Sequence, residues 1–474
     1  QDLAALGPDD TAAHANIVAC LPEFDAWAEP LDSLHLPAQS SVSASIPTGS
    51  IEPASSRSKT LRRATFDAWG HAMANIALDG ERLDRLTISA RLAREEDPAV
   101  RKRLFLTMET AWRTLNGDNG STSPYRRLIA ESSAQWVRDG SPVSANAGAL
   151  GLDPTQVEPM LRRILHAFRA LAIGPDLIEP WDYRYAVGGL SRRLDASVPV
   201  DRMLRINDDH VRSIGADPEH LRIGYDIIPR LGRPVIPTAF TLTEGVAGKD
   251  GSTWVPAVPW VFATYAEGGL GNLEELLHES GHALHYAAIR TRPAQFTWPP
   301  DQTAFVEAIA DVVGWTTHEP AFLRRHLGAD VTLRESVIAR FGGVMLDAAW
   351  TLFEIEVHRH PDRSPNDAWA EIAERDLGIR GHAEWSWWAG RGQLIDGPGY
   401  LANYALGAVM VAAVRARLQA LRGDWSGGDP GWYAFVSEHL LQFGGARTPW
   451  DLLRGLLGQP LTDEAILGEI ERAG

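Results

Sequence analysis

The stretch "LLHESGHALH", residues 276–285, decides the fold class because it sets a polar motif within an apolar, helix-forming segment. Leucines recur around it at helical spacing, and Asn272 offers a capped start, so the sequence predicts a helix over 273–288. Positions four apart share a helix face, so His278 and His282 are expected to point the same way. Two such histidines can meet one metal ion.

Glu279 completes a His-Glu-x-x-His pattern, which is typical of zinc peptidases but also arises by chance as polar helix residues. A second predicted helix, 303–315, decides between these interpretations. A catalytic zinc takes three protein ligands and keeps one position open, and we expect Glu307 to be the third ligand. Asp311 is expected to accept the free ring N–H of His278. Acids on an apolar helix need a positive partner, which zinc would supply.

Two further positions on the motif helix have structural interpretations. Gly281 is expected to allow another helix to approach closely, and His285 to pack against its neighbours rather than bind metal. His318, His358 and His382 lack the spacing of metal ligands.

Composition narrows the class of protein. The chain has 474 residues, 45% of them hydrophobic and 22% charged, which is ordinary for a globular protein. Its net charge of −16 argues against nucleic acid as a partner. No uninterrupted apolar run reaches transmembrane length. A single cysteine, Cys20, excludes intramolecular disulfides and a cysteine-based metal site. The start at Gln1 rather than Met favours an exported protein, with the cytoplasm left open.

The pattern along the chain predicts a mainly α protein in three parts. Residues 1–59 form an N-terminal segment with a Ser/Ala/Pro-rich linker, 60–172 a helical lobe, and 173–474 a catalytic lobe with the zinc site. Helical periodicity is clear over 61–86 and 157–173. Short β-like runs at 221–229, 233–242 and 258–265 predict a small sheet next to the motif helix.

The sequence resembles the thimet oligopeptidase and oligoendopeptidase F family of zinc metallopeptidases, which is related to angiotensin-converting enzyme. "HESGH" followed by "FVEAIAD" carries the likeness, with Glu307 placed 29 residues after His278. The resemblance extends over residues 165–415. Further similar segments are "EPWDYRY" (179–185), "LRIGYDIIPRLGRP" (221–234) and "PWVFATYAEGGLGNLEELLHESGH" (259–282).

The resemblance implies a mainly α, two-lobed helical metallopeptidase with a deep substrate channel and a small β-sheet beside the metal helix. It implies one Zn²⁺ per chain and short, unfolded peptides as substrates. A peptide would lie as an added strand against the sheet edge near residues 259–265, which makes Phe262 and Ala263 candidate substrate-binding residues.

The resemblance also implies a tyrosine-containing segment after the metal site, matched by "QLIDGPGYLANYALGAVM" (393–410). Tyr404, helped by Tyr400, would donate hydrogen bonds to the oxyanion of the reacting peptide. The family's histidine, about ten residues before the key tyrosine, is replaced here by Leu394 or Ile395, depending on alignment. Candidate replacements are Gln393, Arg391 and His382.

Three functions stay open at this point. The first is an oligopeptidase, in which Glu279 takes a proton from a zinc-activated water. If Arg391 binds a peptide carboxylate, the enzyme would instead release C-terminal residues or dipeptides. The second is a zinc carboxypeptidase of the helical His-Glu-x-x-His type. The third is a non-catalytic peptide-binding relative, favoured by the missing histidine and opposed by the intact Glu279. Neither cleavage preference nor oligomeric state follows from the sequence.

Overall fold

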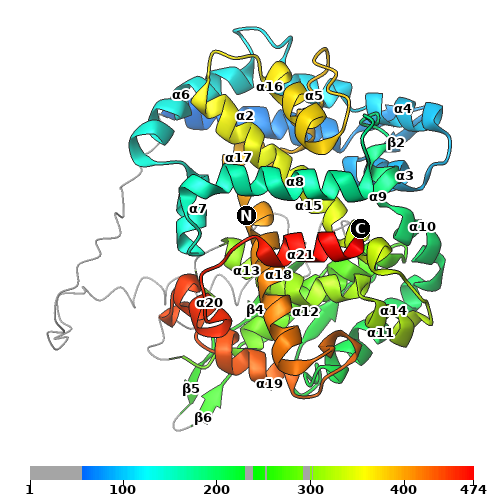
Figure 1. The fold of residues 1–474 in the computed structure, drawn as a ribbon, viewed down its shortest axis with the longest axis vertical. Coiled ribbons are helices and arrows are strands. Elements are labelled where there is room, and N and C mark those ends of the chain that lie inside the picture. The colour runs from blue at the N-terminus through cyan, green and yellow to red at the C-terminus, as the bar shows by residue number, and fades with distance from the viewer. Residues whose placement is uncertain (1–55, 230–238, 251–252, 292–298, 301–302) are drawn as a thin grey trace, which may run out of the picture.

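A computed structural model describes residues 56–229, 239–250, 253–291, 299–300 and 303–474 (Figure 1). Most of the predicted N-terminal part, 1–59, and of the β-like run at 233–242 lies outside the described residues. Helices dominate the described chain and the sheets are small, which confirms the mainly α fold class.

Along the chain, α-helices precede and follow a sheet region near its middle. They are α2 (Ser56–Met73), α3 (Arg85–Arg94), α4 (Pro98–Leu106), α5 (Glu109–Asn116), α6 (Pro124–Asp139), α7 (Pro142–Ala149), α8 (Val157–Ala172), α9 (Tyr183–Val187), α10 (Gly189–Leu194), α11 (Val200–Ser213), α12 (Leu270–Ala288), α13 (Thr303–Gly314), α14 (Pro320–Leu327), α15 (Leu333–Arg359), α16 (Pro365–Ile372), α17 (Gln393–Asp396), α18 (Ala402–Arg422), α19 (Trp432–Val436), α20 (Pro449–Leu457) and α21 (Glu464–Ala473). The strands are β1 (Ile76–Leu78), β2 (Glu81–Leu83), β3 (Gly224–Asp226), β4 (Phe240–Glu244), β5 (Gly248–Asp250), β6 (Thr253–Val255) and β7 (Val258–Phe262).

The predicted helical run over 61–86 is interrupted by a hairpin, so the expectation there was only partly right. β1 and β2 pair antiparallel around Asp79 and Gly80, which have φ angles of 51° and 83°. An Asp-Gly pair tolerates these positive φ values and favours a tight hairpin turn over a continuous helix. The other helical prediction, over 157–173, is confirmed by α8.

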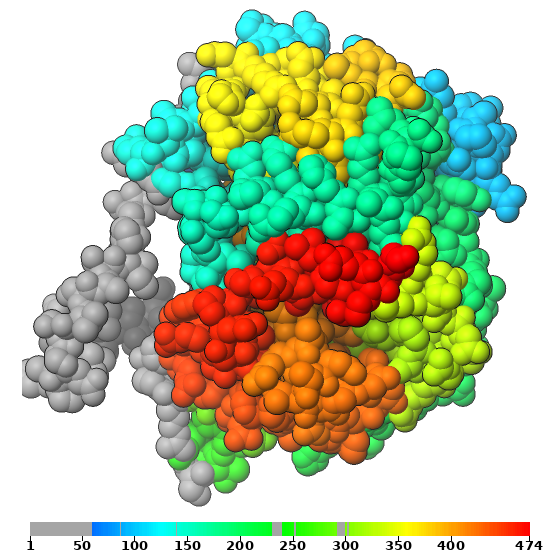
Figure 2. All heavy atoms as spheres, in the orientation of Figure 1, coloured from blue at the N-terminus to red at the C-terminus, as the bar shows by residue number. Residues whose placement is uncertain are grey.

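The long helix α15 packs against helices from both predicted lobes. α6 and α8 contact it from the first lobe, and α16, α18 and α21 from the second. Figure 2 shows α8 lying directly against α21 on the visible face, although α8 lies in the first half of the chain and α21 is its last helix. Helices before and after residue 172 therefore share one buried core, and the lobe boundary stays a prediction.

Two helices in the described part of the chain, α15 and α18, are long and apolar enough to cross a membrane. Their most apolar windows are 72% and 61% buried inside the protein, respectively. Core helices of globular proteins have the same character, so these two are weak evidence for a membrane span.

A three-stranded sheet with the order β3-β7-β4 lies against the motif helix α12. β7 is central: Phe262 is paired with Asp226 of parallel β3 and with Phe240 of antiparallel β4. The expectation that a peptide adds to the sheet near residues 259–265 is therefore wrong in its position, because neighbours already flank Phe262 on both sides. Among the described strands, β4 is an edge of this sheet on the side away from β7.

Candidate metal centre

The motif helix α12 begins two residues before Asn272, which is not its N-cap. Gly269 precedes the helix with a φ of 112°, a conformation that favours glycine, and the backbone N–H of Leu270 donates to Asp195 Oδ1 at 2.9 Å. The cap comes from a residue distant in sequence, so the predicted capping box does not form. The apolar face of α12 is fully buried, with Leu273, Leu276, Leu277 and Leu284 at its centre.

α13 packs unusually close to α12. A Cβ atom at Gly281 would lie 2.8 Å from the Ala310 Cα, and one at Gly314 would lie 3.1 Å from the His278 Cβ. Real side chains do not tolerate the first distance, so the absence of a Cβ is required there. The prediction that Gly281 allows a close helix approach is confirmed, and the approach brings the acidic residues of α13 to the histidines of α12.

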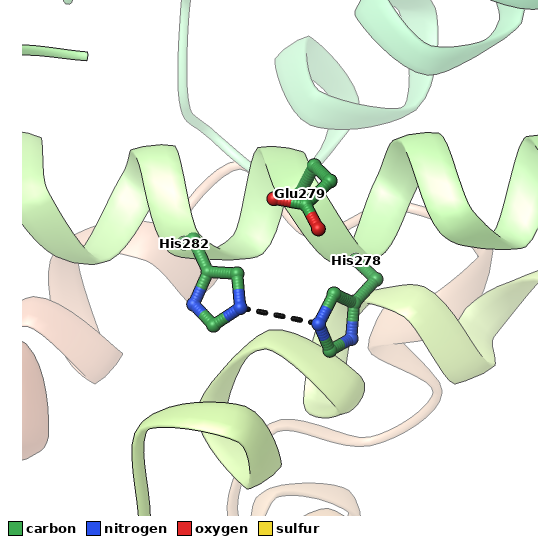
Figure 3. A group of neighbouring side chains, drawn as sticks. All are labelled: His278, Glu279 and His282. Atoms are coloured by element: carbon green, nitrogen blue, oxygen red, sulfur yellow. Dashed lines mark hydrogen bonds between the residues drawn. The ribbon is translucent and has the colours of Figure 1, made fainter. Parts of the chain in front are cut away.

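The two motif histidines converge on one point (Figure 3). Their rings lie on one side of α12, and the His278 and His282 Nε2 atoms are 3.1 Å apart. A Glu307 carboxylate oxygen lies 3.6 Å from His278 Nε2. Ligands of a tetrahedral zinc with bonds of 2.0–2.1 Å lie about 3.4 Å from one another. The two separations, both measured from His278 Nε2, lie on either side of that value, so His282 and Glu307 are each placed at a ligand-like distance from His278.

Asp311 lies next to His278, its predicted partner. Its Oδ1 is 2.7 Å from His278 Nδ1, which leaves His278 Nε2 directed toward His282 and Glu307. Burial alone would lower the pKa of His278, but Asp311 and Glu307 raise it well above its ordinary value. Burial and the charge of His278 lower the pKa of His282 to about 3. The acidic pair thus favours a cation at His278, either a proton or a metal ion.

Glu279 lies within the same cluster and is 6% exposed. Burial raises the pKa of its carboxyl group, an effect opposed in part by His278 and by a hydrogen bond from Thr241. Thr241 lies on the edge strand β4, and its Oγ1 donates a hydrogen bond to Glu279 Oε2 at 2.6 Å. Sequence reasoning missed Thr241, because nothing in the 38 residues that separate the two signals a contact. In the described part of the chain, no lysine or arginine forms an ion pair with Glu279, Glu307 or Asp311.

The two predicted tyrosines lie next to each other near α13. The rings of Tyr400 and Tyr404 are 5.7 Å apart at an angle of 68°. Burial raises the pKa of both hydroxyl groups, and the charge of Glu307 raises it further. Both therefore stay protonated near neutral pH and can donate hydrogen bonds. α18, which carries Tyr404, packs against α13 through Gly407.

The candidate replacements for the missing histidine fall in different places. Leu394 and Ile395, one of which occupies the position of the missing histidine, are each 1% exposed and belong to the core. Gln393, the first candidate, begins α17 and is half-buried. His382 binds Glu179 and Glu384 and stacks on Trp385, away from the motif helix. Arg391 lies 5.7 Å from the ring of Tyr404, so it is the candidate that reaches the tyrosine pair.

The remaining histidines near the motif are packed. His285 is 1% exposed and lies edge-on to Phe305, and burial lowers its pKa to about 4. This confirms the interpretation of His285 as a packed residue. His318 is buried beside Glu274, at 3.7 Å.

Comparison with known proteins finds peptidases among the proteins that resemble this chain. No family model matches the chain. The mitochondrial intermediate peptidase of Candida albicans is 25% identical over 211 residues, which is 40% of this chain and 26% of that protein. The oligoendopeptidase F of Enterococcus faecium has a TM-score of 0.51 at 14% identity, covering 88% of this chain and 73% of that one. The M32 carboxypeptidase of Deinococcus radiodurans has a TM-score of 0.55 at 16% identity, covering 99% and 93%.

The chain shares the fold of these peptidases. The resemblance to the oligoendopeptidase F group that the motifs indicated is confirmed by this likeness. The chain spans only about a quarter of the length of the curated relative that it matches. The roles of the individual site residues stay predictions.

Proposed function

We propose that this chain is a zinc metallopeptidase that hydrolyses peptide bonds in short peptides. The proposal rests on the 3.1 Å approach of the His278 and His282 Nε2 atoms with a Glu307 oxygen 3.6 Å from the first. Two imidazoles and one carboxylate suit zinc and leave one position open. The likeness to proteins named as peptidases supports the same activity.

Each side chain around the centre has a separate role in the proposed hydrolysis. Zinc, when bound, supplies Lewis acidity and lowers the pKa of water. Glu279, held by Thr241, accepts the proton of the attacking water and passes it to the leaving amine. Tyr404, helped by Tyr400, donates to the developing oxyanion. Asp311 holds the ring of His278 in the tautomer that a metal requires.

The outer edge of β4, which pairs with no other described strand, supports an extended peptide as substrate. Thr241 of this strand contacts Glu279, so a peptide added along β4 would pass the proposed general base. Backbone pairing of this kind needs an unfolded segment, which favours short peptides over folded proteins.

The test combines metal analysis with a quenched-fluorescent peptide assay. We expect one zinc per chain, and hydrolysis that a chelator stops and zinc restores. Glu279→Gln should keep zinc and lower kcat by about 10²–10⁴-fold, since the general base is lost. Glu267→Gln, whose side chain is 82% exposed just before α12, is the matched control and should behave as wild type.

Two results would contradict the proposal. Hydrolysis at the wild-type rate by metal-replete Glu279→Gln would remove Glu279 from its role. Zinc binding without any hydrolysis by the wild-type protein would favour the non-catalytic peptide-binding relative.

A zinc carboxypeptidase is the second candidate function. The M32 carboxypeptidase of Deinococcus radiodurans matches nearly the whole of both chains, whereas the oligoendopeptidase F matches 73% of its own length. Mass spectrometry of the products from a ten-residue peptide separates the two functions. Sequential loss of C-terminal residues indicates the carboxypeptidase, and internal cuts the oligopeptidase.

A further inference from the structure

A small cavity lies among α3, α9 and α15 and holds an unbalanced positive charge. Its walls are mostly apolar and include Trp112, Leu346 and Trp350. Its charged lining residues are Arg85 and Arg184. The cavity volume is ≈ 60 Å³. This is the volume open to the centres of water-sized groups, so the cavity has room for a carboxylate group.

Neither guanidinium of the cavity has an anionic partner within the part of the chain that the structure describes. The nearby carboxylate, Asp347, is already engaged by Arg391, whose Nη2 lies 2.9 Å from Asp347 Oδ1. Burial, together with the charges of Arg391 and Arg184, lowers the pKa of Arg85 to about 10. Burial also lowers the pKa of Arg184.

The charge of Asp347 acts on all three arginines, and that of Asp84 acts in addition on Arg85. Burial raises the pKa of Asp347, although Arg391, Arg184 and Arg85 all act to lower it. Buried charges without partners are costly, and the cost is removed when an ion of opposite charge binds. The cluster is therefore suited to an added anion.

The cluster adjoins the candidate metal centre through Arg391. The guanidinium of this residue lies 5.5 Å from the ring of Trp350, which lines the cavity, and 5.7 Å from the ring of Tyr404. The side chains of Trp350 and Arg391 thus connect the cavity to the proposed oxyanion donor.

We propose that Arg85 and Arg184 bind the C-terminal carboxylate of the substrate peptide, so that hydrolysis takes place near its C-terminus. This deepens the proposed peptidase function and rests on it. Guanidinium groups match the two oxygens of a carboxylate in a fork-like geometry. The sequence suggested Arg391 for this role. Its ion pair with Asp347 assigns it instead to positioning, between the carboxylate site and Tyr404.

The experiment compares one hexapeptide in two forms, with a free C-terminal carboxylate and with a C-terminal amide. We expect the wild-type protein to prefer the free acid by about 10–100-fold in kcat/KM, the range for hydrogen bonds to charged groups. Arg85→Gln and Arg184→Gln should lose this preference through a higher KM for the acid and leave the amide unchanged. Arg324→Gln, on an arginine that is 65% exposed, should keep the preference.

Two further measurements separate the proposal from misfolding and from failure of the peptidase function. Thermal unfolding should show both variants at least as stable as wild type, since each removes a half-buried positive charge that forms no ion pair among the described residues. Calorimetry with N-acetyl-trialanine and its amide, on the wild-type protein, measures carboxylate binding without any hydrolysis. Tighter binding of the acid that both variants lose supports the proposal, even when no peptide is cleaved.

Several outcomes would overturn the carboxylate site. Equal cleavage and equal binding of acid and amide by the wild-type protein is one. An equal fall in the cleavage of acid and amide by the variants is another, because it indicates a structural role. Inorganic phosphate that binds at Arg85 and Arg184 while the peptide acid does not would assign the cavity to a free anion.

Discussion

The helix pair α12–α13 and the segment from Arg391 to Tyr404 both contribute to the candidate active site, but they are built differently. On the helix pair, His278, His282 and Glu307 are placed by regular helical spacing and by one close helix contact at Gly281. The second segment joins the short helix α17 to the start of α18 by a turn and is held by residues distant in sequence. Arg391 pairs with Asp347, and Asn146 donates to Asn403 at 2.7 Å.

The difference separates two tasks. Metal ligands must hold fixed distances, which rigid helices supply at low cost. The groups proposed to contact the substrate lie on a segment whose position depends on the surrounding lobe, as is common for binding residues on loops. Variants in the first region should therefore change metal binding, and variants in the second should change turnover with the metal retained.

Loss of a metal ligand is the largest expected effect. Glu307→Ala removes one of three protein ligands, so zinc content and hydrolysis should both fall to background. Metal analysis after dialysis and the fluorescent peptide assay measure the two. The control is Glu471→Ala, on an exposed residue of α21. Full zinc content in Glu307→Ala would exclude Glu307 as a ligand. The metal centre would then not depend on the helix pair α12–α13.

Tyr404→Phe should lower turnover next most strongly. Loss of one oxyanion donor costs about 10²–10³-fold in kcat, and zinc content should stay unchanged because Tyr404 is not a ligand. Steady-state kinetics with parallel metal analysis measures both. Tyr185→Phe, which keeps an aromatic ring next to Arg192, is the control. Unchanged kcat in Tyr404→Phe would transfer the role to Tyr400.

The first region could be predicted from the sequence because its rules are local. Helical spacing alone places His278 and His282 on one face, and the same rule applies to Glu307 and Asp311. What failed depends on contacts between distant segments. The start of α12 is set by Asp195, and Thr241 reaches Glu279 only after the sheet forms.

The second region shows the same limit more strongly. The sequence identified Tyr400 and Tyr404, since they lie in a recognisable segment. Arg85 and Arg184 carry no spacing signal, because they meet Arg391 only when three remote segments fold together. The strand position at Phe262 was missed because strand order within a sheet is not encoded in any single strand.

Asp311→Asn should sharpen the distinction within the metal region itself. Asparagine keeps an acceptor for the His278 ring but loses the negative charge, so zinc affinity should fall about 10–100-fold. Saturating zinc should restore most of the hydrolysis, unlike in Glu307→Ala. Competition titration with a chromophoric chelator measures the affinity. An unchanged affinity would show that Asp311 does not act through His278.

Glu354→Gln has the smallest expected effect and tests the remote support of the tyrosine segment. Glu354 is fully buried on α15, and its Oε1 accepts the backbone N–H of Gly399 at 2.7 Å. Burial raises its pKa from 4.5 to about 8. Between these values the unfolded chain has released a proton that the folded chain retains. The carboxyl group therefore makes the protein less stable as pH rises through this window.

Glutamine does not titrate and keeps an acceptor for Gly399, so the variant should gain stability relative to wild type from pH 5 to pH 8. The expected gain is on the order of 2 °C in Tm, measured by thermal unfolding at both pH values. Turnover should stay near the wild-type level in Glu354→Gln and fall in Glu354→Ala, which leaves Gly399 without its acceptor. Equal turnover in both variants would show that Tyr400 and Tyr404 do not depend on α15, and the second region would then be as self-contained as the first.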